Sequence, residues 1–340
     1  MGGGRIPGDL GELERGLSRR LAVPRLLGSS PLSLGRDRPR TRPTMSGWVV
    51  YRQLNKDYAY WTEKRRVGQQ RGGHVAGLLT HWEDREVRLN ILFDAGLGTL
   101  EGLADFCEDS FWDEPLVVFI THGHIDHHAE LMILSEIYCK RRGKHLHDVR
   151  PPLPVFGAAE THEHLRRVHQ YGFTEGGTLR QKTIIAGSLV MADIFQVTPM
   201  AVDHFEGAVI FVIEFGAARR HKIVVGWDLK TLTLGDGHIE RLRRSSLALI
   251  ESTTWTPMTQ LTGHASVEQL VSTGFLDRLE LQFDPEQEKY GAYLVHYSGW
   301  EDPWGMLADD QLKARFDRAY PHLSEAVRVA ERGQCWSFTL

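Results

Sequence analysis

The segment Thr121–His128 constrains the fold and the chemistry of this chain more than any other part of the sequence. It reads Thr-His-Gly-His-Ile-Asp-His-His and lies between the apolar run 115–120, which predicts a buried strand, and the stretch 129–142, which predicts a helix. The loop thus carries four side chains of types that bind Zn²⁺ and related divalent ions: His122, His124, Asp126 and His127. In a tight loop, the first two can reach one cation together while the last two turn toward a neighbouring one.

The overall composition is that of an ordinary globular protein. The chain has 340 residues, 41% of them hydrophobic, and a net charge of −4, which gives no strong nucleic-acid signature. Its three cysteines show no paired spacing, as expected in a reducing compartment. The sequence contains no apolar run of the ~20 residues needed to span a bilayer. We therefore expect a cytoplasmic protein without a membrane partner.

Residues 1–44 differ from the rest of the chain, because they contain nine arginines and no lysine. They lack the continuous apolar core of a secretory signal, and their four acidic residues argue against an Arg-rich targeting peptide. We expect a disordered Arg-rich N-terminal extension over 1–44 and one folded domain over 45–340.

Within the domain, strands come first, helices then alternate with strands, and the arrangement recurs. This order predicts an α+β fold built as an αββα sandwich, with two facing sheets and helices outside. The predicted strands are 48–53, 75–82, 86–93, 115–120, 151–156, 188–200, 207–215, 222–226, 247–250 and 292–295. The predicted helices begin near Leu100 and cover 129–142, 158–168, 267–276 and 309–316.

Three further candidate ligands each follow an apolar run directly, where a rigid strand end would fix their geometry. His204 comes after 197–203, Asp228 after 223–227 and His296 after 292–295. Because the Thr121–His128 segment also ends a strand, the sequence predicts that four strand ends converge on one edge of the sandwich.

The segment matches His-x-His-x-Asp-His, and the chain from about Val75 to His296 resembles the metallo-β-lactamase superfamily of metal-dependent hydrolases. The resemblance implies two divalent ions, with Zn²⁺ favoured and Mn²⁺ also accepted. It implies that His122, His124 and His204 bind one ion, that Asp126, His127 and His296 bind the other, and that Asp228 bridges them. We also assign Asp126 a catalytic role. The sequence departs from the family after the motif, where His128-Ala-Glu-Leu131 lacks the usual glycine.

Two further elements resemble the phosphodiesterase branch, which includes transfer-RNA 3′-processing nucleases and cyclic phosphodiesterases. They are Leu249-Ile-Glu-Ser-Thr253 and Thr262-Gly-His-Ala-Ser266, the second with Ala-Ser in place of the branch's Ser-Thr. The resemblance makes His264 the general acid and Glu251 the residue that orients it. A phosphodiester loses a poor alkoxide leaving group, so such an acid contributes roughly 10²–10⁴-fold to the rate.

The interval between His204 and Asp228 is 228 − 204 = 24 residues, enough for a strand, a turn and a second strand. It cannot hold the long arm of the transfer-RNA nucleases, so we expect a small or cyclic phosphodiester as substrate, and relatives of this branch suggest a homodimer. An acyl hydrolase, such as a lactonase or thioesterase, is the alternative, and in it His264 would be dispensable. A non-catalytic member of the fold is disfavoured because every ligand is present.

The sequence does not decide the roles of several other polar residues. Asp94 could accept hydrogen bonds from the Thr121–His128 loop or could cap the following helix. His128 could contact the site or be solvated. His162 and His164 lie two apart in a predicted helix and therefore point to different faces, so we expect both at the surface.

Overall fold

The computed structural model describes residues 47–56, 74–145, 151–184, 189–191, 194–230, 235–257, 263–299, 302–305 and 307–340. The expected extension 1–44 and Thr262 lie outside the described residues. Among the described helices, none is long and apolar enough to cross a membrane.

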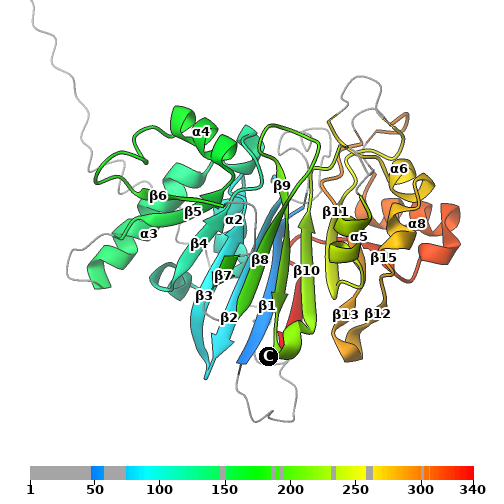
Figure 1. The fold of residues 1–340 in the computed structure, drawn as a ribbon, viewed down its shortest axis with the longest axis horizontal. Coiled ribbons are helices and arrows are strands. Elements are labelled where there is room, and N and C mark those ends of the chain that lie inside the picture. Colours follow the sequence, from blue (N-terminus) through cyan, green and yellow to red (C-terminus); the bar gives the residue numbers. More distant parts are fainter. Residues whose placement is uncertain are drawn as a thin grey trace, which may run out of the picture. The chain divides into compact units, whose positions relative to one another are not determined.

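Two seven-stranded sheets form the framework of the domain (Figure 1). The first has the order β16-β1-β2-β3-β4-β5-β6, with β16 Cys335–Thr339, β1 Gly47–Asn55, β2 Ala76–Glu83, β3 Glu86–Phe93, β4 Leu116–Phe119, β5 Leu153–Gly157 and β6 Leu179–Thr183. The second has the order β15-β14-β11-β10-β9-β8-β7, with β15 Val327–Val329, β14 Ala292–Val295, β11 Leu247–Glu251, β10 His221–Gly226, β9 Val209–Phe215, β8 Phe195–Ala201 and β7 Leu189–Met191. A small hairpin joins β12 Phe283–Asp284 to β13 Lys289–Tyr290.

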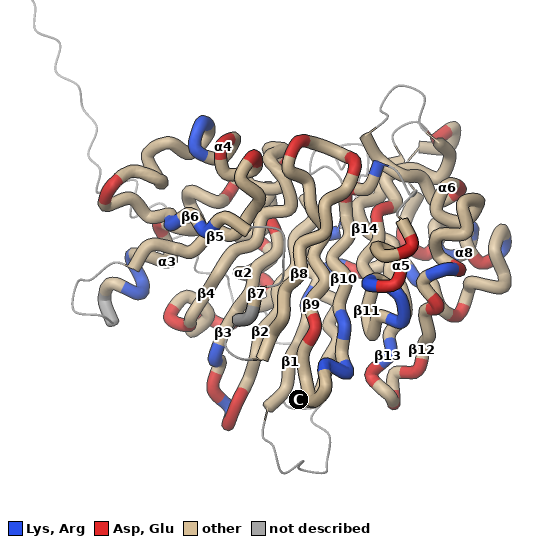
Figure 2. Tube along the Cα trace, in the orientation of Figure 1, with Lys and Arg blue, Asp and Glu red and all other residues tan. Residues whose placement is uncertain are grey.

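Helices cover the outer face of each sheet. On the first sheet lie α2 Thr99–Phe106, α3 Leu131–His145 and α4 Ala159–Val168, and on the second lie α5 Asp236–Leu242, α6 Val267–Ser272, α7 Phe275–Arg278 and α8 Asp309–Ala319. In Figure 2, both acidic and basic residues lie on α4, α5 and the surface near α8, while the central strands carry mostly uncharged residues.

Three apolar clusters define the layers. Phe93 of β3 and Phe211 of β9 belong to the cluster between the two sheets, whereas Leu92 of β3 belongs to the cluster under α2–α4. This alternation follows from the two-residue period of a strand, whose successive side chains point to opposite faces. The third cluster packs the second sheet against α5–α8 and includes Val224 and Phe316. The predicted αββα sandwich is confirmed.

The structure differs from the predicted elements in places. The run 188–200 forms two antiparallel strands, β7 and β8, rather than one. The predicted helix 267–276 is divided into α6 and α7, because Gly274 adopts a left-handed conformation with φ 65° between them. The strands β6, β12, β13, β15 and β16 and the helix α5 were not predicted from the sequence.

Candidate metal centre

Parallel pairing brings the predicted site residues to one edge of the sandwich. Strand β3 is parallel to β4, and β10, β11 and β14 are mutually parallel neighbours in the second sheet. Their carboxyl ends therefore lie at the same edge, as in other parallel arrangements whose site residues follow the strands. Asp94, the Thr121–His128 loop, Asp228 and His296 all follow these ends. His204 enters from the β8–β9 connection, and the N–H of Val209, the first residue of β9, donates to the carbonyl of Thr121 at 3.0 Å.

Three histidine nitrogens form a small triangle. Nε2 of His122 lies 2.9 Å from Nδ1 of His124, and Nε2 of His204 lies 3.2 Å from each of them. A tetrahedral Zn²⁺ with Zn–N distances of about 2.0–2.1 Å needs nitrogens about 3.3 Å apart, so the triangle fits a metal ion. The chemistry of the three donors fits it as well.

A second set of donors surrounds the buried carboxylate of Asp228, which is 2% exposed. Nε2 of His127 lies 2.6 Å and Nε2 of His122 lies 3.8 Å from its Oδ2, and Nδ1 of His296 lies 3.1 Å from its Oδ1. Neither oxygen of Asp228 makes a hydrogen bond of acceptable geometry. A buried carboxylate without hydrogen bonds is costly, and a cation at this position would compensate its charge. Asp126, His127 and His296 also bring ligand atoms within 4.8 Å of one another.

Hydrogen bonds on the far side of the rings fix which nitrogen three of the histidines present. His204 donates from Nδ1 to the carbonyl of Gly263, and His127 donates from Nδ1 to Asp94 at 2.8 Å. Thr121 donates its hydroxyl to Asp94 and accepts from Nδ1 of His122 at 3.1 Å. In each ring Nδ1 therefore holds a proton, which leaves Nε2 as the nitrogen that would bind a cation, the usual arrangement around a metal-binding histidine.

Asp94 anchors the Thr121–His128 loop, which decides between its two predicted roles. The side chain is fully buried, and it accepts hydrogen bonds from the N–H of Thr121, the hydroxyl of Thr121, Nδ1 of His127 and Nε1 of Trp227. The N-cap residue of α2 is instead Gly98, and no side chain caps the helix.

Left-handed backbone conformations occur at three of these strand ends. Asp94 has φ 60°, Asp228 has φ 77° and His296 has φ 65°. Such values are uncommon for residues other than glycine, and they concentrate at functional sites where the surroundings hold them. Here the turn directs each side chain to the edge where the strands end.

The two residues that resemble the acid pair of the phosphodiesterases are in contact. Nδ1 of His264 lies 3.2 Å from Oε2 of Glu251, and also 3.2 Å from Oδ1 of Asp228. The buried Glu251 carboxylate further accepts from the N–H groups of Leu229 and Thr253, both at 3.0 Å. Glu251 therefore contacts both the His264 ring and the backbone N–H of Leu229, the residue after Asp228.

Carboxylates dominate the electrostatics of this edge. Burial alone would lower the pKa of His264, but Glu251 and Asp228 raise it to about 10. Burial opposes ionisation of Glu251 as well, yet His264 and His296 bring the pKa of that carboxyl to about 2. The pKa of His127 is raised well above its usual value, because Asp228, Asp126 and Asp94 outweigh the effect of burial. This concentration of negative charge favours a bound cation.

Sequence reasoning missed several buried histidines. His162 is fully buried, with Nε2 3.2 Å from the carbonyl of Lys182, so its predicted surface position was wrong. Helix α4 turns Thr161, His162 and Leu165 toward the core, whereas His164 is half-buried. His128 is fully buried and contacts His169. His74, whose Nδ1 accepts from the N–H of Leu97, is also buried, and no motif marked it.

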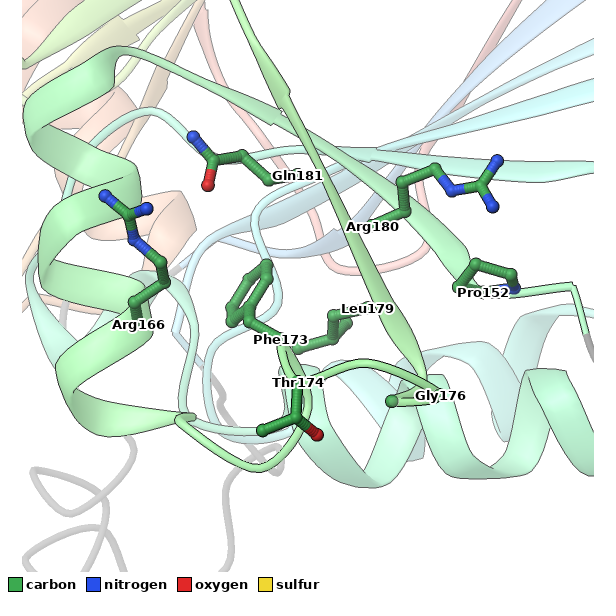
Figure 3. Close-up of a pocket in the computed structure, with 9 residues that line it drawn as sticks. Pro152, Arg166, Phe173, Thr174, Gly176, Leu179, Arg180 and Gln181 are labelled. Atoms are coloured by element: carbon green, nitrogen blue, oxygen red, sulfur yellow. The ribbon is translucent and has the colours of Figure 1, made fainter.

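A cavity of about 450 Å³ lies apart from these residues, between α4, the turn around Gly176 and β6 (Figure 3). Its lining includes Arg166, Phe173, Arg180 and Gln181, and none of the histidines or carboxylates described above.

Residues 89–280, more than half of the chain, match the model of the Beta-lactamase superfamily domain. The chain belongs to the β-lactamase superfamily. The resemblance predicted from the His-x-His-x-Asp-His motif is thereby confirmed, and the chain is a metallo-β-lactamase-fold hydrolase by family. No curated protein sequence matches it significantly.

Solved structures share the fold of this superfamily member at low sequence identity. A diphosphatase from the PhnP family superposes with a TM-score of 0.59 at 15% identity, covering 86% of this chain and 97% of the other. Zn²⁺-bound PqqB from Methylobacterium extorquens gives 0.57 at 14% identity, covering 86% and 100%. The short form of human tRNase Z gives 0.51 at 16% identity, also covering 86% and 100%.

Proposed function

We propose that this protein is a phosphodiesterase that uses two divalent metal ions, Zn²⁺ or Mn²⁺, on a small or cyclic phosphodiester in the cytoplasm. One ion would be held by His122, His124 and His204. The other would be held by Asp126, His127 and His296, with Asp228 between the two. When bound, the ions would polarise a phosphoryl oxygen and activate a water molecule for attack.

The contact between His264 and Glu251 carries the choice of phosphodiesterase. A carboxylate that accepts the Nδ1 proton of a histidine stabilises its protonated form, and the raised pKa of His264, to about 10, agrees with this. His264 would then donate its Nε2 proton to the departing alkoxide. General acid catalysis of this kind raises the rate by about 10²–10⁴-fold. Glu251 would orient the ring.

The remaining residues of the chain support the same reaction. Asp94 would keep His127 in the tautomer that presents Nε2, and the carbonyl of Gly263 would do so for His204. Because Gly263 is adjacent to His264, a single loop would position both a metal ligand and the general acid. Asp126, half-buried beside His127, would contribute a ligand oxygen and orient the activated water.

The short connection between His204 and Asp228 favours a small substrate. It consists of β9, the turn Ala217–Arg219 and β10, as the 24-residue interval predicted. The diphosphatase that shares the fold is a phosphoryl-group enzyme by name, which agrees with phosphorus chemistry here.

A metal-dependent acyl hydrolase is the second candidate, and one distance favours it. His264 lies as close to Asp228 as to Glu251, 3.2 Å in both cases, so it could serve to orient Asp228 instead of protonating a substrate. Hydrolysis of a lactone or thioester does not require the additional acid.

Turnover of bis(p-nitrophenyl) phosphate and of a simple lactone separates the two candidates. Wild type and His264→Ala would be compared after loading with Zn²⁺ or Mn²⁺, with metal content measured for each. We expect diester turnover that falls in the variant while the metal content is retained, with a smaller fall than on an alkyl diester because p-nitrophenol is a good leaving group. Lactone turnover that is indifferent to the substitution would instead assign the protein to the acyl hydrolases.

A further inference from the structure

We propose that His128 and His169 are positioning residues that hold the Gly123 peptide and thereby set the spacing of His122 and His124. The proposal rests on the proposed function, in which those two histidines bind a metal ion together. It concerns two residues that lie outside the ligand set and outside the His264–Glu251 pair.

The hydrogen-bond partners of His128 and His169 determine which ring nitrogens carry a proton. Nε2 of His128 lies 3.1 Å from the carbonyl of Gly123, and Nε2 of His169 lies 3.2 Å from the carbonyl of His128. A carbonyl oxygen only accepts, so both Nε2 atoms carry a proton. The Nε2–H of His169 is then shared between the carbonyl oxygen of His128 and Nδ1 of His128, which lies 2.9 Å away. The two rings form a directed chain that ends on Gly123.

The chain is anchored in the folded core at its other end. His169 terminates α4, where its N–H donates to the carbonyl of Leu165 at 2.7 Å, and the Leu165 side chain is fully buried. His128 is also fully buried and His169 is 8% exposed, so water competes little for their hydrogen bonds. The end of α4 therefore fixes the position and orientation of the His128 ring, and through this ring it restrains the Thr121–His128 loop.

Gly123 is the residue between the two ligands, and α4 contacts it from a second direction. A side chain at this position would place Cβ only 2.9 Å from Cγ of His164. The glycine is therefore enclosed by the His164 ring on one side, while its carbonyl is held by His128. Rotation of the Gly123 peptide would move His124 relative to His122, whose facing nitrogens are 2.9 Å apart. Metal sites tolerate misplacement of only about 0.5 Å, so this restraint acts directly on affinity.

The chain offers a matched control in His162. It is a fully buried histidine on the same helix, and its Nε2 likewise lies 3.2 Å from a carbonyl oxygen, that of Lys182. Lys182 belongs to β6, so this bond ties α4 to the sheet edge and not to the metal loop. Loss of His162 would weaken the packing of α4 without releasing Gly123.

The test compares metal affinity in the full-length chain. Metal-free wild type, His128→Phe, His169→Phe, His128→Gln and the control His162→Phe would be titrated with Zn²⁺ against a chromophoric chelator. The visible spectrum of the Co²⁺-loaded proteins would report the ligand geometry, and thermal unfolding of the metal-free proteins would report folding. Phenylalanine keeps a ring and removes both nitrogens, whereas glutamine keeps an N–H donor near the Nε2 position.

We expect Zn²⁺ to bind about 10–100-fold more weakly to His128→Phe and His169→Phe, as with other partners of metal-binding residues. His128→Gln should recover most of the affinity, and His162→Phe should keep it even where it lowers the unfolding temperature. Equal losses of affinity in His128→Phe and His162→Phe, or no loss in either, would overturn the inference. Failure of the wild type itself to bind Zn²⁺ would instead refute the proposed function.

Discussion

Oδ2 of Asp94 lies 2.8 Å from Nδ1 of His127, and the same oxygen accepts from the Thr121 hydroxyl and the Trp227 indole. One buried carboxylate thus binds the loop that follows β4 and the residue that precedes Asp228. Both sheets of the sandwich are joined through it.

Asp94→Asn tests this anchor. An amide offers one oxygen where the carboxylate offers two, so a donor would be left facing an N–H₂ group, and His127 would lose its fixed tautomer. We expect metal affinity to fall about 10–100-fold, measured by competition with a chelator. Asp302→Asn is the matched control, because Asp302 is a buried carboxylate that accepts from the N–H groups of Trp255 and Thr256 in another loop. Equal losses of affinity in the two variants would refute a specific role of Asp94.

His264→Ala and Glu251→Gln test the general acid and its partner. We expect kcat on a phosphodiester to fall about 10²–10⁴-fold in His264→Ala, with KM and metal content little changed. Glu251→Gln should reduce kcat less, since the ring remains but loses the charge that favours its protonated form. A diester with a p-nitrophenol leaving group should be less affected than an alkyl diester, because a good leaving group needs little protonation. Equal loss on both diesters would argue against acid catalysis by His264.

Gly96→Ala tests how tightly the loop after β3 packs against the metal loop. A Cβ at Gly96 would lie 1.7 Å from the carbonyl oxygen of Asp126 and 2.6 Å from Cβ of His74. We expect a loss of about 1–3 kcal/mol in the free energy of unfolding, together with weaker metal binding as Asp126 is displaced. Gly237→Ala in α5 is the control, because its Cβ meets nothing within 4 Å, and it should stabilise the protein by about 0.4–1 kcal/mol. Urea unfolding of the two variants gives the comparison.

Removal of metal should lower stability by mass action. A ligand that binds only the folded chain contributes about 2.7 kcal/mol at a concentration of 100 Kd. We expect the unfolding temperature to fall on chelation in wild type and to change little in Asp228→Asn. A fall of the same size in Asp228→Asn would place the stabilising metal elsewhere.

Glu288 lies outside the candidate metal centre and should make the stability of the protein depend on pH. Burial would raise the pKa of its carboxyl, but His221 and Thr339 lower it below its usual value. A carboxyl whose folded pKa is depressed stabilises the protein above its unfolded pKa of about 4.3, and this contribution is lost as the pH falls through the folded value. Glu288→Gln should therefore cost about 1 kcal/mol near pH 7, and its difference from wild type should shrink below about pH 4. A difference that stays constant down to pH 2 would contradict this assignment.

The sequence was sufficient to predict which histidines and carboxylates come together at this edge, because each of them had a local signal. The Thr121–His128 loop has its ligands within six residues, and His204, Asp228 and His296 each follow an apolar run. The convergence of these strand ends could also be predicted, since it depends on parallel order rather than on exact boundaries.

Features that depend on distant partners could not be predicted. Strand β16 exists because it pairs with β1, with Trp48 opposite Thr339, and its own five residues alternate between exposed and buried positions. His169 acquires its place through a bond to His128, 41 residues earlier. The error at His162 has a similar cause, because only the position of β6 makes that face of α4 an inner one.

The left-handed backbone at Asp228, like that at Asp94 and His296, costs conformational energy in return for placing a side chain at the edge where the strands end. Each conformation costs an L-residue roughly 1–2 kcal/mol, which glycine would avoid. Selection of the metal-free chain for heat resistance alone should therefore enrich glycine at Asp228, whose buried oxygens make no hydrogen bonds, and discard its donor atoms, whereas four accepted hydrogen bonds would retain Asp94. A programme of laboratory evolution would need metal present at every round to keep Asp228.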